Sequence, residues 1–129
     1  MDNRGVAIKI GGREYELILT TRATKEIAGR YGGLEALGEQ LMKAENFEMA
    51  LDEVCWLLTL LANQSVLIHN LQHKDAPRDL LTAEEMGLLT SPLELAGYKN
   101  AITEAMFKGT ARNIESEPAE GDEKNTQAG

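Results

Sequence analysis

The sequence predicts a mainly α-helical (α+β) fold, in which a small N-terminal β-hairpin packs on a bundle of about five helices around one central apolar helix. Three observations lead to this prediction. Residues 47–72 carry apolar side chains at helical spacing over more than half of the helix circumference. Residues 6–19 contain two short β-prone runs on either side of a glycine pair. Farther along, two capping boxes mark the starts of two further helices.

The hairpin is predicted in detail, because Gly11-Gly12 can adopt the positive φ angles of a two-residue turn. This turn determines which residues face each other, and it separates an apolar face from a charged one. A lone hairpin is marginal in water, so we expect its apolar face to pack on the central helix. The predicted pairs are Val6–Leu17, Ala7–Glu16, Ile8–Tyr15, Lys9–Glu14 and Ile10–Arg13.

Two helices are expected between the hairpin and the central helix. Thr20 and Thr21 can cap the first, which stops at Gly32-Gly33. The second should cover residues 34–44, where leucines repeat at intervals of three and four residues.

The central helix over residues 47–72 carries two adjacent apolar stripes. Its uninterrupted apolar part extends only from Val54 to Ala62, whereas a membrane span needs roughly 20 apolar residues, so we expect a core helix. One stripe comprises Phe47, Leu51, Val54, Leu58, Leu61 and Ile68, and the other Ala50, Leu57, Leu60, Leu67 and Leu71.

The last two helices are predicted to begin at the capping boxes Thr82–Glu85 and Ser91–Glu94. The final helix should fray from Gly109 on. Its inward stripe is predicted to comprise Leu95, Tyr98, Ile102, Ala105 and Met106.

The length of 129 residues is that of one domain, which we place at residues 1–112. Residues 113–129 have almost no apolar content and are predicted to form a disordered acidic tail. The formal net charge of −8 disfavours nucleic acid and anionic membranes as partners. The N-terminus has no apolar segment behind a basic start, so we expect a cytoplasmic protein.

Three residues could carry chemistry, and each has a simpler interpretation. His69 and His73 stand four residues apart, the spacing of two zinc ligands on one helix face. No third ligand is apparent, so we interpret them as exposed side chains near a helix end. Cys55 has no candidate base at a neighbouring helical position, and we interpret it as a core residue in a reducing compartment. We therefore expect no enzyme, no metal site and no cofactor.

Residues 24–42 combine a helix, a glycine turn and a second helix, an order that also occurs in helix-turn-helix DNA readers. The second helix would present Glu35 and Glu39 first, with only Gln40 and Lys43 suited to contact DNA. This acidity favours two packed scaffold helices. A small helix-turn-helix-like DNA-binding regulator remains the alternative interpretation.

The order of three segments resembles a known family. Residues 10–17, IGGREYEL, have the pattern I-x-G-x-x-Y-x-L, and residues 20–27, TTRATKEI, have the pattern T-x-R-A-x-K-E-I with YGG soon after. A core helix that contains Trp56 follows. In this order they resemble the small tail assembly chaperones of phages and prophages with long tails. The resemblance covers roughly residues 6–107.

The resemblance implies a chaperone that binds the tape measure protein in the host cytoplasm, keeps it soluble and recruits tail tube subunits during virion assembly. Several copies would coat one long client, and a homo-oligomer is compatible with this role. The family has no catalytic residues to carry over. A structural tail component that stays in the particle is a further alternative.

A chaperone of this kind needs apolar side chains that its own fold leaves uncovered. Ile18 falls on the charged face of the hairpin, and Phe107 lies off the inward stripe of the last helix. Trp56 lies between the two apolar stripes of the central helix, where an indole is either a contact anchor or a filler of the core edge. The candidate partner-binding residues are therefore Ile18, Trp56 and Phe107.

Overall fold

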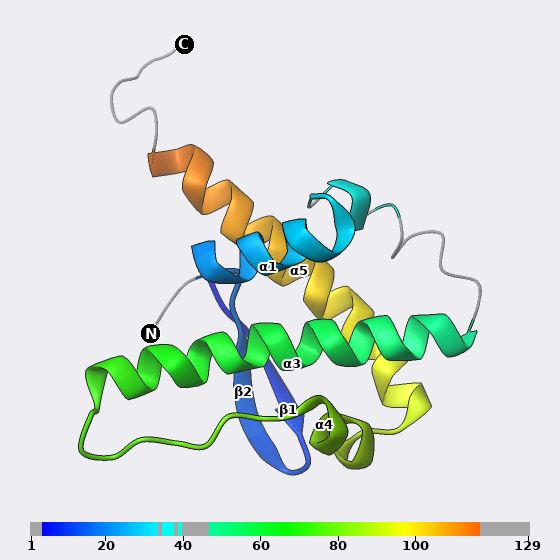
Figure 1. Cartoon of the computed structure of the whole chain (residues 1–129), viewed down its shortest axis with the longest axis horizontal. Coiled ribbons are helices and arrows are strands. Elements are labelled where there is room, and N and C mark those ends of the chain that lie inside the picture. Colours follow the sequence, from blue (N-terminus) through cyan, green and yellow to red (C-terminus); the bar gives the residue numbers. More distant parts are fainter. Residues whose placement is uncertain (1–3, 34, 38, 40–46, 117–129) are drawn as a thin grey trace.

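The structure, a computed structural model, describes residues 4–33, 35–37, 39 and 47–116. It is mainly helical with one two-stranded antiparallel hairpin, as the sequence predicts (Figure 1). Its elements are β1 (Val6–Ile10), β2 (Arg13–Leu17), α1 (Thr21–Tyr31), α3 (Phe47–Gln72), α4 (Ala83–Leu89) and α5 (Pro92–Ser116).

The hairpin has the predicted register at all of its strand pairs. Gly11 and Gly12 form the turn with φ angles of 58° and 83°, which side chains with a Cβ rarely adopt. Ile10 and Leu17 on the apolar face are buried, whereas Lys9 on the charged face is exposed. The alternation of side chains along the strands therefore predicted correctly which face of the hairpin is buried.

Helix α1 begins after Thr20, whose hydroxyl accepts a hydrogen bond from the backbone of the first turn. It ends at Gly32, which has a φ of 93° and whose N–H donates to the carbonyl of Ala28. Residues 35–37 and 39 are helical. The remainder of the second helix predicted over 34–44 lies outside the described residues.

Helix α3 forms the centre of the core and contacts α1, α4, α5 and β2 (Figure 1). In the first predicted stripe, Val54, Leu58 and Leu61 are buried. In the second stripe Leu57 is buried, but Leu71 is 71% exposed. The other described elements thus leave part of the second stripe uncovered.

Within the described residues, the segment Leu51–Gln72 of α3 has a length of 22 residues and a mean hydropathy of 1.3, sufficient in principle to cross a membrane. The core helix of a soluble protein can meet the same criteria, and 39% of this apolar stretch of α3 is buried by the rest of the described structure. The segment extends beyond the apolar run Val54 to Ala62 because it contains no Asp, Glu, Lys or Arg after Glu53.

Helices α4 and α5 begin at the predicted capping boxes. The backbone N–H of Glu85 donates to the Thr82 hydroxyl, and the Thr82 N–H donates to the Glu85 carboxylate, both at 3.0 Å. Ser91 and Glu94 make the same two bonds, at 3.2 and 2.9 Å. These reciprocal bonds satisfy backbone donors that a helix start otherwise leaves unpaired.

The predicted inward stripe of α5 faces the core: Leu95, Ile102 and Ala105 are buried, and Tyr98 and Met106 pack against the core while partly buried.

Gly109 does not begin the fraying of α5, and that prediction is wrong. The residue is buried where the helix approaches Leu19, and a Cβ atom at position 109 would lie 2.8 Å from the Leu19 Cβ. The glycine is therefore required for close packing, and α5 continues to Ser116. Residues 113–116 are thus helical, and residues 117–129 of the predicted tail lie outside the described part of the chain.

Candidate functional site

One side of α3 borders a groove with a volume of about 320 Å³. Helix α1 and the segment that leads into α4 provide the rest of its lining. Helix α1 contributes two charged side chains, Arg22 and Glu26. Helix α3 contributes three apolar and three polar side chains: Trp56, Leu60, Leu67, Thr59, Asn63 and Gln64. Residues 80–83 complete the lining, with Leu80 and Leu81 as their large apolar side chains.

The helical spacing explains why the α3 residues lie together. Trp56, Leu60, Asn63 and Leu67 follow one another at steps of four, three and four residues, so they occupy one face of the helix. All four are only partly buried. The face therefore retains solvent-accessible apolar surface, whereas Leu57, Leu58 and Leu61 on the core side of the same helix are fully buried.

Asn63 attaches the segment before α4 to the central helix. Its side-chain nitrogen donates to the Leu81 carbonyl, and its side-chain oxygen accepts from the Leu81 N–H, each at 2.8 Å. The amide thus pairs with Leu81 as a neighbouring strand would. Leu81 is buried, and the adjacent Leu80 lines the groove with 47% of its surface exposed.

Gln64 connects α3 to the start of α1. Its side-chain oxygen accepts a hydrogen bond from the Thr20 hydroxyl at 2.5 Å, and its nitrogen donates to the Leu60 carbonyl at 3.1 Å. The residue is 4% exposed, so both polar atoms need these partners. This bond and the Asn63 pair hold both sides of the groove to the same helix.

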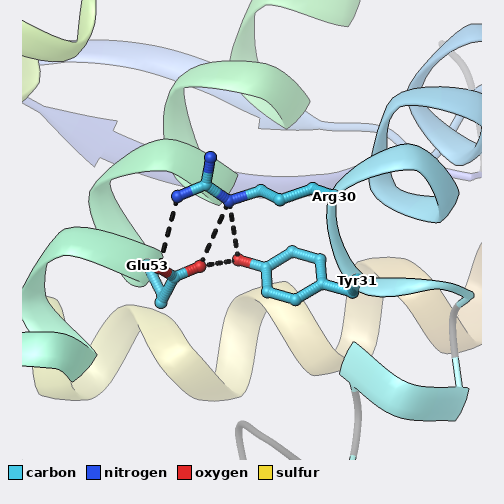
Figure 2. Close-up of polar contacts among 3 residues, drawn as sticks. All are labelled: Arg30, Tyr31 and Glu53. Carbon is cyan, nitrogen blue, oxygen red and sulfur yellow. Dashed lines mark hydrogen bonds and ion pairs between the residues drawn. The ribbon is translucent and has the colours of Figure 1, made fainter.

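A polar cluster of Arg30, Tyr31 and Glu53 lies where the end of α1 meets α3 (Figure 2). It lies beside Trp56. The Arg30 guanidinium makes two bonds to the Glu53 carboxylate, at 3.2 and 3.3 Å, and Tyr31 donates its hydroxyl hydrogen to the same carboxylate. The guanidinium carbon also lies 4.4 Å from the centre of the Trp56 ring. The Tyr31 ring meets this indole edge-on, with 6.0 Å between ring centres. Both aromatic contacts orient Trp56 at the groove.

The protonation states in this cluster follow from its contacts. Burial raises the pKa of the Tyr31 phenol to about 12, and the hydrogen bond to Glu53 adds to this effect. Partial burial opposes ionisation of Glu53, but hydrogen bonds from Arg30 and Tyr31 together lower the pKa of its carboxyl. At neutral pH, a charged Arg30–Glu53 pair therefore lies beside a neutral phenol.

The structure separates the three predicted partner-binding residues. Ile18 is 1% exposed, so the prediction that it lies on the charged face is wrong. It follows the last residue of β2, and its N–H donates to the Leu61 carbonyl on α3 at 3.3 Å, so this position packs against α3 and does not face solvent. Phe107 is 73% exposed on α5, as expected, but does not line the groove. Only Trp56 belongs to the groove.

Leu60, Leu67 and Leu80 line the groove but were not among the site residues predicted from the sequence. Leu60 and Leu67 belong to the second predicted apolar stripe of α3. The two stripes together cover more of the helix circumference than the core needs, and this excess is the signal in the sequence that part of the apolar surface stays open. Leu80 carries no such sign, because its exposure depends on the direction in which Asn63 holds the chain.

The structure also shows the surroundings of His69, His73 and Cys55. The rings of His69 and His73 are stacked with 4.4 Å between their centres, and a nitrogen of each ring pairs with a backbone carbonyl. Among the described residues, no group of three or more His, Cys, Asp or Glu side chains could hold a metal ion. Burial raises the pKa of the Cys55 thiol, and the charge of Asp52 raises it further, which disfavours the nucleophilic thiolate.

Comparison with known proteins identified no relative: no protein-family model, curated protein or solved structure matches the chain.

Proposed function

We propose that this protein is a tail assembly chaperone of a long-tailed phage or prophage, which binds and solubilises the tape measure protein and recruits tail tube subunits. The order of sequence motifs supports the family, and the groove along α3 supports a binding role. The observation that carries the proposal is the partly open apolar face of the central helix, formed by Trp56, Leu60 and Leu67.

An amphipathic helix is the client that this groove suits best, because helices bind grooves through apolar residues repeated every three or four positions. The face from Trp56 to Leu67 spans eleven residue steps on α3, or about 17 Å, which matches about three turns of a client helix lying along it. Each copy would cover one short segment of a long tape measure protein. Repeated weak contacts give tight coating as a whole but allow tube subunits to displace single copies.

The surface around Phe107 offers a separate apolar contact. Its ring is 73% exposed on α5 and lies outside the groove. We assign this second surface to tail tube subunits or to neighbouring chaperone copies. Such a division would let the protein hold its client and contact another subunit at the same time.

The proposal is tested by the solubility of the neighbouring tape measure protein, expressed alone and together with this protein. Leu80→Glu introduces a charge into the groove at a partly exposed position, and Leu88→Glu makes the same change at a leucine on α4 that is 80% exposed and does not line the groove. We expect the wild type and Leu88→Glu to solubilise the client, and Leu80→Glu to do so poorly. Without rescue by the wild type, the chaperone assignment would fail. Equal rescue by Leu80→Glu would exclude the groove but not the function.

A further inference from the structure

The outer edge of β2 carries backbone groups that point away from β1. In an antiparallel hairpin with a two-residue turn, the residues that flank the turn bond to each other, and alternate residues direct their N–H and C=O groups outward. On β2 the outward residues are therefore Glu14 and Glu16. Two contacts agree with this pattern: the Lys9 carbonyl, opposite Glu14, accepts from Tyr98 outside the hairpin, and the Ile18 N–H reaches α3.

The two edges of the hairpin differ in how they are covered. At the β1 edge, Tyr98 donates to the Lys9 carbonyl, and the Lys108 ammonium lies 3.3 Å from the Gly5 carbonyl. Within the described part of the chain, no hydrogen bond from outside the hairpin reaches the outward backbone groups of Glu14 and Glu16 on β2. An uncovered strand edge is a template for pairing with another extended chain.

The side chains along this edge exclude a second copy of the same strand. Glu14 and Glu16 lie on the charged face of the hairpin: Glu14 is exposed, whereas Glu16 is partly buried and its carboxylate lies against Gly5. Neither carboxylate forms an ion pair with a described residue. If two β2 edges paired antiparallel, their outward residues would face one another, so every register that pairs three or more residues of each strand would place a glutamate opposite a glutamate. Like charges in this position are destabilising. The acidic stretch 117–129 is disfavoured for the same reason.

We infer that the β2 edge binds an extended basic segment of another protein, which adds a third strand to the sheet and places Lys or Arg opposite Glu14 and Glu16. Backbone hydrogen bonds between β2 and the added strand would provide the affinity, and the two carboxylates would favour a positively charged segment over a neutral or acidic one. The residue between the two basic positions would face the apolar side of the hairpin, so a small β-branched residue fits there. This surface shares no residue with the groove on α3, and the inference is independent of the proposed function.

The probe is the peptide acetyl-Thr-Lys-Val-Lys-Thr-amide, and the readout is amide hydrogen exchange of the full chain followed by NMR. In the free protein, we expect fast exchange at Glu14 and Glu16 and slower exchange at Tyr15 and Leu17, whose N–H groups bond to β1. The peptide should slow exchange at the two glutamates. A peptide with both lysine amides N-methylated keeps its charge but loses the donors that face β2, and it should not bind.

Charge selection is tested with the double variant Glu14→Lys, Glu16→Lys. It should bind the basic peptide about tenfold more weakly than the wild type and bind the corresponding Glu-Val-Glu peptide instead. The double variant Asp52→Lys, Glu84→Lys makes the same change in net charge away from the hairpin and should behave as the wild type. Three results would each overturn the inference. The N-methylated peptide could bind as well as the unmodified one, or millimolar peptide could fail to slow exchange at Glu14 and Glu16. In the third, the two amides would become protected without peptide as the protein concentration rises, which would indicate pairing between copies of the chain.

Discussion

The close approach of α5 to the core predicts opposite effects for two Gly→Ala substitutions in the same helix. Alanine stabilises a helix interior by about 1 kcal/mol relative to glycine. At Gly97 an added Cβ would meet no atom within 4 Å, so Gly97→Ala should gain most of this free energy. At Gly109 the added Cβ would lie 2.8 Å from the Leu19 Cβ and 3.0 Å from its Cδ2. The Leu19 Cβ is attached to the backbone, so a change of rotamer cannot relieve this contact.

Overpacking of this kind typically costs about 1–3 kcal/mol, which exceeds the gain in helix propensity. We expect Gly109→Ala to lower the free energy of unfolding by about 1 kcal/mol, and the melting temperature by about 4 °C for a chain of this size. Urea and thermal unfolding, each followed by circular dichroism, measure both quantities. If Gly109→Ala stabilised the protein as much as Gly97→Ala, α5 could not pack on Leu19 as described.

Two further predictions concern the buried isoleucine and the phenol. Ile18→Asp should destabilise the fold by more than about 4 kcal/mol because it places a carboxyl in the core, whereas Phe107→Asp at an exposed position should change stability by less than about 0.5 kcal/mol. Similar urea midpoints for the two variants would contradict the burial of Ile18. The pKa of Tyr31 is raised from 10.0 to about 12, so its contribution to stability should be complete below pH 10 and lost as the pH rises toward 12. Tyr31→Phe should reduce the dependence between pH 10 and 12 and leave the part that comes from other groups, such as Tyr98, whose pKa burial also raises. An unchanged stability profile would show that the Tyr31 phenol does not titrate with a raised pKa.

The hairpin register and the helix starts could be predicted because the interactions that determine them are local. Gly11-Gly12 allows the two-residue turn, and the turn determines every strand pair. Each capping box joins residues three positions apart, such as Thr82 and Glu85. Helical periodicity likewise predicted which side chains of α5 would be buried.

The candidate site could be predicted only in part, because exposure depends on neighbours that are distant in the sequence. The sequence places Trp56 between the two apolar stripes of α3, as a contact anchor or as a filler of the core edge. Its place at the groove follows from the way α1 packs on α3. The Arg30–Glu53 ion pair helps to fix this packing, and it joins residues 23 positions apart in the sequence. Leu80 lines the groove because Asn63 holds the backbone of the next residue from 18 positions away.

The sequence alone determined the fold class, the hairpin register, the capped helix starts and the apolar face of α5, since backbone geometry links neighbouring residues directly. Only the tertiary structure decided which side of α3 remains open, that Ile18 is buried and that Gly109 allows α5 to approach Leu19. Each of these outcomes depends on contacts between separate elements. The physical reason is that an amphipathic pattern specifies which side chains should avoid water but not which part of the fold, or which partner, covers them.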